Sequence, residues 1–176
     1  MTVSYRQAGV ADAARLALVA SATFAFACPP HTTAAGIQDF VAANLSERAF
    51  TDYLADGRRV LFLAEFDGLP IGYTMVVLGE PNDADVAAAL TFRPTAELSK
   101  CYVLPGHHGR GVASHLMALS VRAACDRGAS GIWLGVNNEN VKANRFYEKS
   151  GFAIVGTKSF RVGTELERDF VREREL

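Results

Sequence analysis

The chain has 176 residues, of which 49% are hydrophobic and 21% charged, a usage typical of a globular protein and unlike that of a disordered tail. Its 18 Lys and Arg residues nearly balance 19 Asp and Glu residues. Without a net positive charge or a basic run, the chain lacks the electrostatic footprint of a nucleic-acid-binding protein. At this length we expect one domain, spanning residues 1–176.

The first third of the chain predicts one short strand followed by helices. Residues 2–6 alternate as a strand does, and residues 10–27 carry apolar side chains at helical spacing until Pro29-Pro30. A second helix is expected over residues 33–54, before Gly57.

Two features bear on the compartment. The apolar run of residues 16–28 is shorter than the roughly 20 residues that a membrane span needs, and Asp12 and Arg15 lie where a signal peptide would have its apolar core. The three cysteines are widely spaced and odd in number, which suits reduced thiols rather than disulfides. We therefore expect a cytoplasmic protein without a membrane partner.

The middle of the chain changes to the period of strands. Residues 60–66 and 71–78 are rich in β-forming residues, and the Asp67-Gly68 between them predicts a hairpin. Residues 79–84 are polar and acidic and predict a loop, and residues 96–104 predict another strand.

The last third predicts alternating elements. In order, they are a helix ending at Arg127, a strand over residues 132–136, a helix from its cap Asn140 through Tyr147, and closing strands over residues 152–162 and 169–173. The early hairpin and the late β-α-β unit together predict an α+β fold, a mixed and mostly antiparallel sheet with helices on both faces.

Residues 102–114 form the most informative segment. They predict a strand, a turn with Gly106, Gly109 and Gly111, and the start of a helix. Glycine leaves backbone N–H groups accessible, and the first N–H groups of a helix are unpaired at its positive end. The turn therefore suits a phosphate or pyrophosphate, although a plain turn without a ligand explains this segment alone equally well.

Three kinds of phosphate site compete for this turn. A Walker-type loop needs Gly-Lys-Ser/Thr, but Val112 follows Gly111. A dinucleotide fingerprint has a third glycine where Ser114 stands, and it belongs to the first strand of its unit, whereas about 100 residues precede this turn. Glu139 could imitate the ribose-binding acid of that fingerprint. The third kind is a coenzyme A site.

Two motifs resemble those of a known family. The run His108-Gly109-Arg110-Gly111-Val112-Ala113 resembles the (Arg/Gln)-x-x-Gly-x-(Gly/Ala) motif of the GCN5-related N-acetyltransferases. The stretch from Asn140 to Phe152 is similar to the second motif of that family, Asn-x-x-Ala-x-x-Phe-Tyr-x-x-x-Gly-Phe. The element order matches over most of the chain. The first motif departs at His108, which puts one phosphate contact in doubt and leaves the backbone donors in place.

The resemblance implies an acyl-CoA N-acyltransferase fold and direct transfer of the acetyl group of acetyl-CoA to an amine. Three finer features resemble the polyamine N-acetyltransferase branch, namely Phe24 ahead of Pro29-Pro30, the approach to Gly57, and Gly156-Thr157-x-x-Phe160-x-x-Gly163 before Asp169.

The resemblance also implies which residues hold acetyl-CoA. The pantetheine arm pairs with a strand edge that splays from residues 132–136, the pyrophosphate lies on the glycine turn, and Asn140 bonds the arm. The implied cosubstrate-binding residues are Tyr102, Val103, Leu104, His108, Gly109, Arg110, Gly111, Val112, Ala113, Ser114, Asn140, Ala143, Phe146 and Tyr147.

Tyr147 is implied as the general acid, because a phenol with a pKa of about 10 keeps a proton for the departing thiolate. By helical spacing alone it is a core aromatic. Glu97 is the candidate base, directly or through a water, with a solvated carboxylate at the strand end as the alternative. The N–H near Val103 could polarise the thioester carbonyl.

Other chemistry is less favoured. Cys101 suggests an acetyl-enzyme, but direct transfer needs no such nucleophile and a buried strand cysteine is commoner. His107, His108 and His115 lack an acidic or Cys partner at ligand spacing, so no metal site is expected.

The acceptor pocket is expected between the helices of residues 20–55, the loop of residues 79–94 and the turn near residues 161–165. The leading hypothesis is a small-molecule primary amine, polyamine-like or amino-acid-like, as acceptor. The alternatives are a protein or peptide amine, a non-catalytic CoA-binding regulatory module, and a dinucleotide-dependent oxidoreductase. The edges of the terminal strands are compatible with a homodimer, which nothing in the residues demands.

Overall fold

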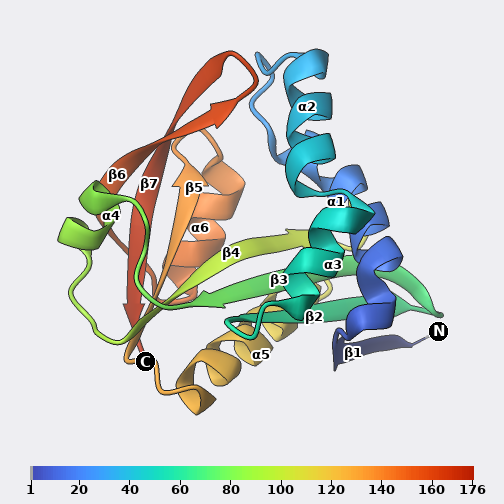
Figure 1. Ribbon diagram of the computed structural model, residues 1–176, viewed down its shortest axis with the longest axis horizontal. Helices are drawn as coiled ribbons and strands as arrows, with labels where there is room; N and C mark the ends of the chain where they lie inside the picture. Colours follow the sequence, from blue (N-terminus) through green and yellow to red (C-terminus); the bar gives the residue numbers. More distant parts are fainter. Residues whose placement is uncertain (1) are drawn as a thin grey trace.

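The computed structural model describes residues 2–176, with Phe160 described by its backbone alone. Its strands are β1 (Val3–Gln7), β2 (Arg59–Phe66), β3 (Leu69–Leu78), β4 (Thr95–Val103), β5 (Gly131–Asn137), β6 (Ala153–Val162) and β7 (Glu165–Glu175). They form one sheet in the order β1-β2-β3-β4-β5-β7-β6 (Figure 1). Only β4 and β5 are parallel neighbours, which confirms the expected mixed and mostly antiparallel sheet.

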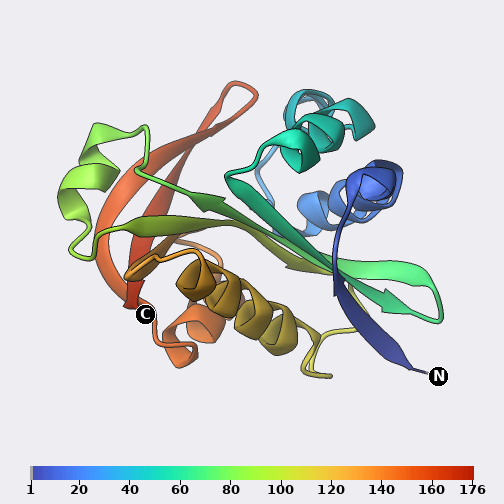
Figure 2. The ribbon, with the colours of Figure 1, turned by 60° about the horizontal axis from the view of Figure 1, so that its bottom comes forward.

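Helices lie on both faces of this sheet, as expected. They are α1 (Ala13–Ala27), preceded by a 3₁₀ turn, α2 (Ala34–Asn44), α3 (Glu47–Ala55), α4 (Ala84–Ala89), α5 (Val112–Asp126) and α6 (Val141–Lys149). Helices α1 to α3 cover one face, and α5 and α6 cover the other (Figure 2). We call these the α1 face and the α5 face.

Each face has its own core. The residues of β2 alternate between them, so that Leu61 and Leu63 pack under α1 whereas Phe62 and Ala64 pack against α5. The α1 face is filled by fully buried large side chains, Leu16, Phe50 and Tyr73 among them. Each such Leu or Phe stabilises the fold by roughly 1.5–3 kcal/mol.

Helix α1 is apolar on both its buried and its exposed side. Leu16, Val19 and Phe24 are buried in the core, but Leu18 and Phe26 are exposed. Together with the preceding turn, the helical segment Val10–Ala27 is long and apolar enough to cross a membrane by length and composition, and 39% of it is buried against the rest of the chain. The expected helix is therefore present, with one face in the core.

The structure corrects the prediction of a single helix over residues 33–54. Leu45 leaves helical geometry with a φ of −127°, and the Ser46 hydroxyl accepts a hydrogen bond from the N–H of Ala49 at 3.2 Å. A serine that caps a new helix ends the continuity of the old one, since its side chain takes the place of a turn of backbone hydrogen bonds. The segment is therefore two helices, α2 and α3.

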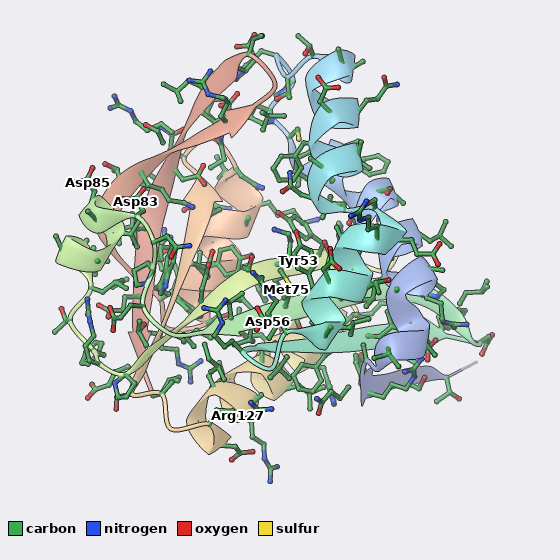
Figure 3. The ribbon with its side chains drawn as sticks, in the orientation of Figure 1. Tyr53, Asp56, Met75, Asp83, Asp85 and Arg127 are labelled. Carbon is green, nitrogen blue, oxygen red and sulfur yellow. The ribbon has the colours of Figure 1, made fainter. Side chains whose placement is uncertain are left out.

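Two further elements depart from the prediction. The short helix α4, after the acidic loop, was not expected; Asp83 begins it by accepting hydrogen bonds from the N–H groups of Asp85 and Val86 (Figure 3). The last strand is longer than residues 169–173, because Gly163, with a φ of +61°, turns β6 directly into β7.

Gly72 lies where β3 and β4 approach each other closely. A Cβ at this position would lie 2.9 Å from the carbonyl oxygen of Tyr102 and 3.1 Å from Cγ2 of Val103. Because a backbone carbonyl cannot move aside as a flexible side chain can, we expect Gly72→Ala to lower the free energy of unfolding by roughly 1–3 kcal/mol in urea denaturation. Gly57→Ala, whose Cβ meets nothing within 4 Å, is the control and should change stability by less than about 0.5 kcal/mol. Equal stability of the two variants would contradict the contact.

Candidate active site

The centre of the sheet opens because β4 and β5 part. They pair only where Thr95, Ala96 and Glu97 meet Gly131, Ile132 and Trp133. Beyond Glu97, β4 has no partner on this side among the strands that the structure describes, although it stays paired with β3 as far as Val103. Figure 1 shows β5 turning away from β4 beyond this short pairing.

The free edge of β4 presents backbone groups to this gap. Leu104 donates its N–H back to the carbonyl of Ile71 at 2.8 Å, on the β3 side. Since successive strand residues point their polar backbone groups to opposite sides, those of Val103 and Cys101 face the gap. Strand groups that no neighbouring strand pairs bind an extended ligand in the way that a further strand would, and here only the Val103 carbonyl has a side-chain contact, with His108, among the described residues.

The glycine turn lies at the end of this edge and leads into α5. Gly106, Gly109 and Gly111 have φ values of +88°, +76° and +76°, conformations that favour glycine. His115 makes the first hydrogen bond of α5, from its N–H to the carbonyl of Gly111 at 2.9 Å. The N–H groups of Val112, Ala113 and Ser114 therefore have no partner within the helix, and they form an anion site at its positive end.

His108, where the resembling motif has Arg or Gln, joins the turn to both neighbouring elements. Its Nε2 lies 2.8 Å from the carbonyl oxygen of Val103, and its Nδ1 lies 2.9 Å from Nζ of Lys142 on α6. A lysine ammonium can only donate, so Nδ1 accepts and Nε2 donates, which defines a neutral imidazole. This contact holds the cation of Lys142 beside the glycine turn.

Tyr147 lies on α6 against the other side of the gap. Asn140 begins this helix by accepting a hydrogen bond from the N–H of Ala143 at 3.0 Å. The phenol of Tyr147 and the thiol of Cys101 on β4 lie close enough to influence each other's pKa. Burial raises the pKa of Tyr147 well above 10, so the phenol stays protonated. Burial also raises the pKa of Cys101 to about 12, which makes its thiol a poor nucleophile at neutral pH.

These features line one cleft of about 620 Å³. Of the residues that the sequence singled out for the cosubstrate and for catalysis, the cleft brings together Glu97, Tyr102, Val103, His108, Gly109, Gly111, Val112, Ala113, Ser114, Asn140, Ala143, Phe146 and Tyr147. Leu104 and Arg110 do not line it. Leu104 instead lines a separate pocket of about 290 Å³ beside α1 and the β2–β3 hairpin.

On the α1 face, the cleft has an aromatic wall. Phe24 of α1 and Phe40 of α2 stack with ring centroids 4.4 Å apart and an angle of 9° between their planes. The hairpin between β6 and β7 closes this wall, where a Cβ on Gly163 would lie 2.7 Å from the Cα of Gly36 on α2.

The rest of the cleft on the α1 face is lined by charged side chains. Glu97 and Lys100 come from β4, and desolvation lowers the pKa of Lys100 to about 8, although Glu97 opposes this shift. Arg59 of β2 is level with Glu97 across β3, and its charge also lowers the pKa of Lys100. It forms an ion pair with Asp56 at 3.1 Å and lies over the ring of Tyr53, beside Met75 (Figure 3).

Five charged residues of the cleft were not predicted: Lys100 on β4, Lys142 on α6, Lys158 on β6, and Glu167 and Asp169 on β7. Glu167 is engaged at both oxygens, with Nε2 of His31 at 2.6 Å and Nδ2 of Asn137 at 3.2 Å. Asp169 is 6% exposed, and its Oδ1 has no hydrogen-bond partner within the described residues. Burial raises the pKa of Asp169 to about 6, although the nearby Lys158 lowers it. The alternation Glu165, Glu167, Asp169 was the available signal, because it places acids on one face of a strand.

The histidines of the turn region point to different partners. His115 stacks on Tyr5 with centroids 3.9 Å apart, and His107 lies beside Phe66 at 5.6 Å. Among residues 2–176, no group of three or more His, Cys, Asp and Glu side chains is arranged to hold a metal ion.

The fold and the cleft define an acetyltransferase. Residues 28–152 match the model of the acetyltransferase (GNAT) family, and the chain belongs to that family. It is 46% identical over 165 residues to an uncharacterized N-acetyltransferase of Mycobacterium tuberculosis, covering 94% of this chain and 98% of that protein. It is 34% identical over 89 residues to a streptothricin acetyltransferase of Streptomyces lavendulae, covering 49% of this chain and 47% of that protein.

Solved structures agree with this assignment. The PaiA N-acetyltransferase of Thermoplasma acidophilum, solved in complex with coenzyme A, superposes with a TM-score of 0.78 at 18% identity, with all of both chains covered. The acyl-CoA N-acyltransferase fold implied by the sequence motifs is thus confirmed.

The buried carboxyl of Asp169 is expected to have a measurable effect on stability. Because the folded state raises its pKa from 3.8 to about 6, the folded state binds the proton more tightly than the unfolded state, and stability falls as the pH rises from about 4 through about 6. Asp169→Asn removes this fall. We expect the variant to be more stable than the parent by roughly 1–3 kcal/mol at pH 8, and by much less at pH 4.5, in urea denaturation at the two pH values. Asp126→Asn, with a side chain that is 71% exposed, is the control and should show no such pH-dependent difference. A pH-independent difference between Asp169→Asn and the parent would contradict the burial argument.

Proposed function

We propose that the protein transfers the acetyl group of acetyl-CoA directly to the primary amine of a small molecule, polyamine-like or amino-acid-like. The observation that carries this proposal is the meeting of three features in one cleft. These are the free edge of β4, the open N–H groups at the start of α5, and the phenol of Tyr147. In this proposal residues 1–176 act as one catalytic domain. We also assign the protein to the cytoplasm, where its three free cysteines stay reduced.

The residues present fit acetyl-CoA as cosubstrate. Backbone groups of Val103 and Cys101 offer the pantetheine arm a strand-like partner, and the N–H groups from Val112 to Ser114 offer the pyrophosphate an anion site. Lys142, held by His108, adds a cation beside that site. When bound, acetyl-CoA supplies an acetyl group activated as a thioester.

Tyr147 serves as the general acid in this proposal. Burial keeps the phenol protonated, so a proton is available when the thiolate leaves. The phenol lies near the Cys101 thiol, on the free edge of β4. The same thiol stays protonated, which favours direct transfer over an acetyl-enzyme.

A carboxylate of the cleft must accept a proton from the acceptor, because an ammonium group has no lone pair for attack. Glu97 is the candidate that the sequence offers, directly or through a water, and it lines the cleft on the α1 face. Its charge also acts on Lys100, the neighbouring cation of the same strand.

The α1 half of the cleft suits a small amine with apolar carbons. Phe24 and Phe40 provide an apolar wall, and Glu97, Glu167 and Asp169 provide negative charge for a cation. The similarity to a streptothricin acetyltransferase, an enzyme named for a small molecule, supports this substrate class over a protein amine.

The first experiment is release of free thiol from acetyl-CoA in the presence of polyamines, amino acids, aminoglycosides and short peptides. We expect release that depends on a small-molecule amine. Release with peptides alone would assign the enzyme to protein acceptors. Tight binding of acetyl-CoA without release from any acceptor would favour the non-catalytic module, and a lack of binding would overturn the cosubstrate.

Tyr147→Phe tests the acid. We expect kcat to fall by roughly 10²-fold or more, since general acid catalysis contributes about that much, while the affinity for acetyl-CoA measured by calorimetry stays the same. Tyr53→Phe, on α3 and outside the residues that line the cleft, is the matched control and should retain kcat. Full kcat in Tyr147→Phe across the pH range would remove Tyr147 from this role.

A further inference from the structure

We propose that Asp169, rather than Glu97, is the catalytic base that takes the proton from the acceptor ammonium. This inference rests on the proposed function and names the residue that makes its acceptor reactive. In the step, the carboxylate of Asp169 removes one proton from the ammonium nitrogen, and the freed lone pair forms the C–N bond as the C–S bond breaks. Tyr147 gives its proton to the departing sulfur, the second proton of the amine restores the phenol, and Asp169 returns its proton to solvent.

The register of the sheet directs Asp169 into the cleft. Asp169 pairs with Asn137 of β5 on one side and with Lys158 of β6 on the other, so the three side chains share one face. This is the α1 face, because Glu97 and Trp133 pair in the same register and Trp133 lies in the same face as Val171. The carboxylate is therefore on the acceptor side of the gap between β4 and β5.

Gly135 brings this carboxylate close to the gap. A Cβ on Gly135 would lie 3.3 Å from Oδ2 of Asp169 and 2.5 Å from Cε of Lys158. Gly135 belongs to the part of β5 that has left β4, and it lines the cleft. The missing side chain thus leaves room over β5 for the carboxylate and the lysine stem at the place where the strands part.

Asp169 also has an oxygen to offer, unlike its neighbour Glu167. Both oxygens of Glu167 are engaged, by His31 and Asn137, whereas Oδ1 of Asp169 is buried and without a hydrogen-bond donor among the described residues. A buried carboxylate oxygen without a donor destabilises the fold unless a ligand supplies one. An ammonium group supplies both the N–H donor that this oxygen lacks and a positive charge beside the carboxylate.

The electrostatic surroundings suit a base at neutral pH. Burial is the main cause that raises the pKa of Asp169 to about 6, and Glu167 adds to it, whereas Lys158 lowers it. Tyr102 of β4 is the titratable group that faces Asp169 from across the gap. The further titratable residues of the cleft on this side are Cys28 at the end of α1, Glu97 and Lys100, and His31 lies nearby as the partner of Glu167. A base whose pKa lies near the working pH is ionised and still takes up a proton readily.

Tyr102 of β4 also lines the cleft. Its phenol interacts electrostatically with Asp169 and also with Tyr147. An acceptor nitrogen at Asp169 therefore lies on the α1 side of the free edge of β4, with Tyr147 on the α5 side. The acceptor implied is a primary amine whose carbons contact Phe24 and Phe40.

The test compares the pH dependence of kcat and of kcat/KM in four proteins, with an amine that the thiol-release panel identifies. We expect kcat/KM of the parent to decrease as the pH is lowered through about 6, and we call this decrease the acid limb of the profile. Asp169→Asn should lose roughly 10²-fold or more in kcat together with this acid limb, without loss of acetyl-CoA affinity. Lys158→Met should move the limb to higher pH, because the cation that lowers the pKa of Asp169 is gone. Glu97→Gln should keep the limb.

Two results would overturn the inference. One is an Asp169→Asn variant that keeps kcat within threefold of the parent, and the other is an acid limb that persists in Asp169→Asn and disappears in Glu97→Gln. Because both variants are close in size to the residue replaced, thermal melts of each check the fold.

A measurement without turnover separates this inference from the proposed function. Carboxyl ¹³C NMR of the aspartate-labelled parent should show one resonance that titrates near pH 6 and is missing in Asp169→Asn, and it should shift when the amine is added. A midpoint near pH 4 would overturn the role of Asp169 even in an active enzyme. Acetyl-CoA binding with no turnover from any amine would instead overturn the proposed function, whatever the titration.

Discussion

The parting of β4 from β5 is the constraint on which the rest of the site depends. The two strands are parallel neighbours over three residues and then separate, while β4 remains paired with β3. The register of that pairing shifts at Ser99, where β4 has one more residue than β3 between Leu98 and Lys100. A bulge of this kind bends and twists its strand, which directs the second half of β4 away from β5. The bulge thus exposes polar backbone groups in the middle of a sheet, where they would otherwise be paired.

The same bulge explains why the two halves of the cleft differ in chemistry. Before Ser99, Glu97 faces α1; after it, Lys100 and Tyr102 face α1 again, and Cys101 and Val103 face α5. The α5 half is therefore built from backbone donors and a protonated phenol, which suit a long neutral arm with phosphates at its end. The α1 half holds the charges. If Ser99 were paired in regular alternation instead of forming a bulge, Lys100 would face α5 and Cys101 would face α1, which would mix these two environments.

Local signals in the sequence predicted the elements whose ends are set by their own residues. The glycine turn, the start of α5 and the cap of α6 at Asn140 follow from positive φ values and side-chain capping, which depend on a few neighbouring residues. The Asp67-Gly68 hairpin is of the same kind. The break at Ser46 was missed although its cap is local, because the apolar spacing across it continues at helical period.

Asp169 was missed as part of the site for a different reason: the alternating acids of β7 mark one face of the strand but do not show that this face lines the cleft. Its role depends on the pairing of β7 between β5 and β6, an order in which the last strand inserts beside an earlier one. Nothing within residues 165–175 indicates that Gly135, some thirty positions earlier, leaves the space that the carboxylate faces. Glu97, by contrast, precedes the glycine turn on the same strand and was visible as a candidate from the sequence.

The placement of Asp169 also shows how stability and reactivity oppose one another in this cleft. Burial without a donor disfavours the ionised carboxylate, and the same burial brings its pKa into the range where it can take a proton from an amine. Glu167, two residues away on the same face, has a partner at each oxygen, so its ionised form is not disfavoured by a missing hydrogen bond. A hydrogen bond that satisfied Oδ1 of Asp169 would stabilise the fold and would remove the feature that suits this oxygen to an ammonium ligand. The fold can maintain the unpaired oxygen because the large cores on both faces of the sheet supply stability that does not depend on the cleft.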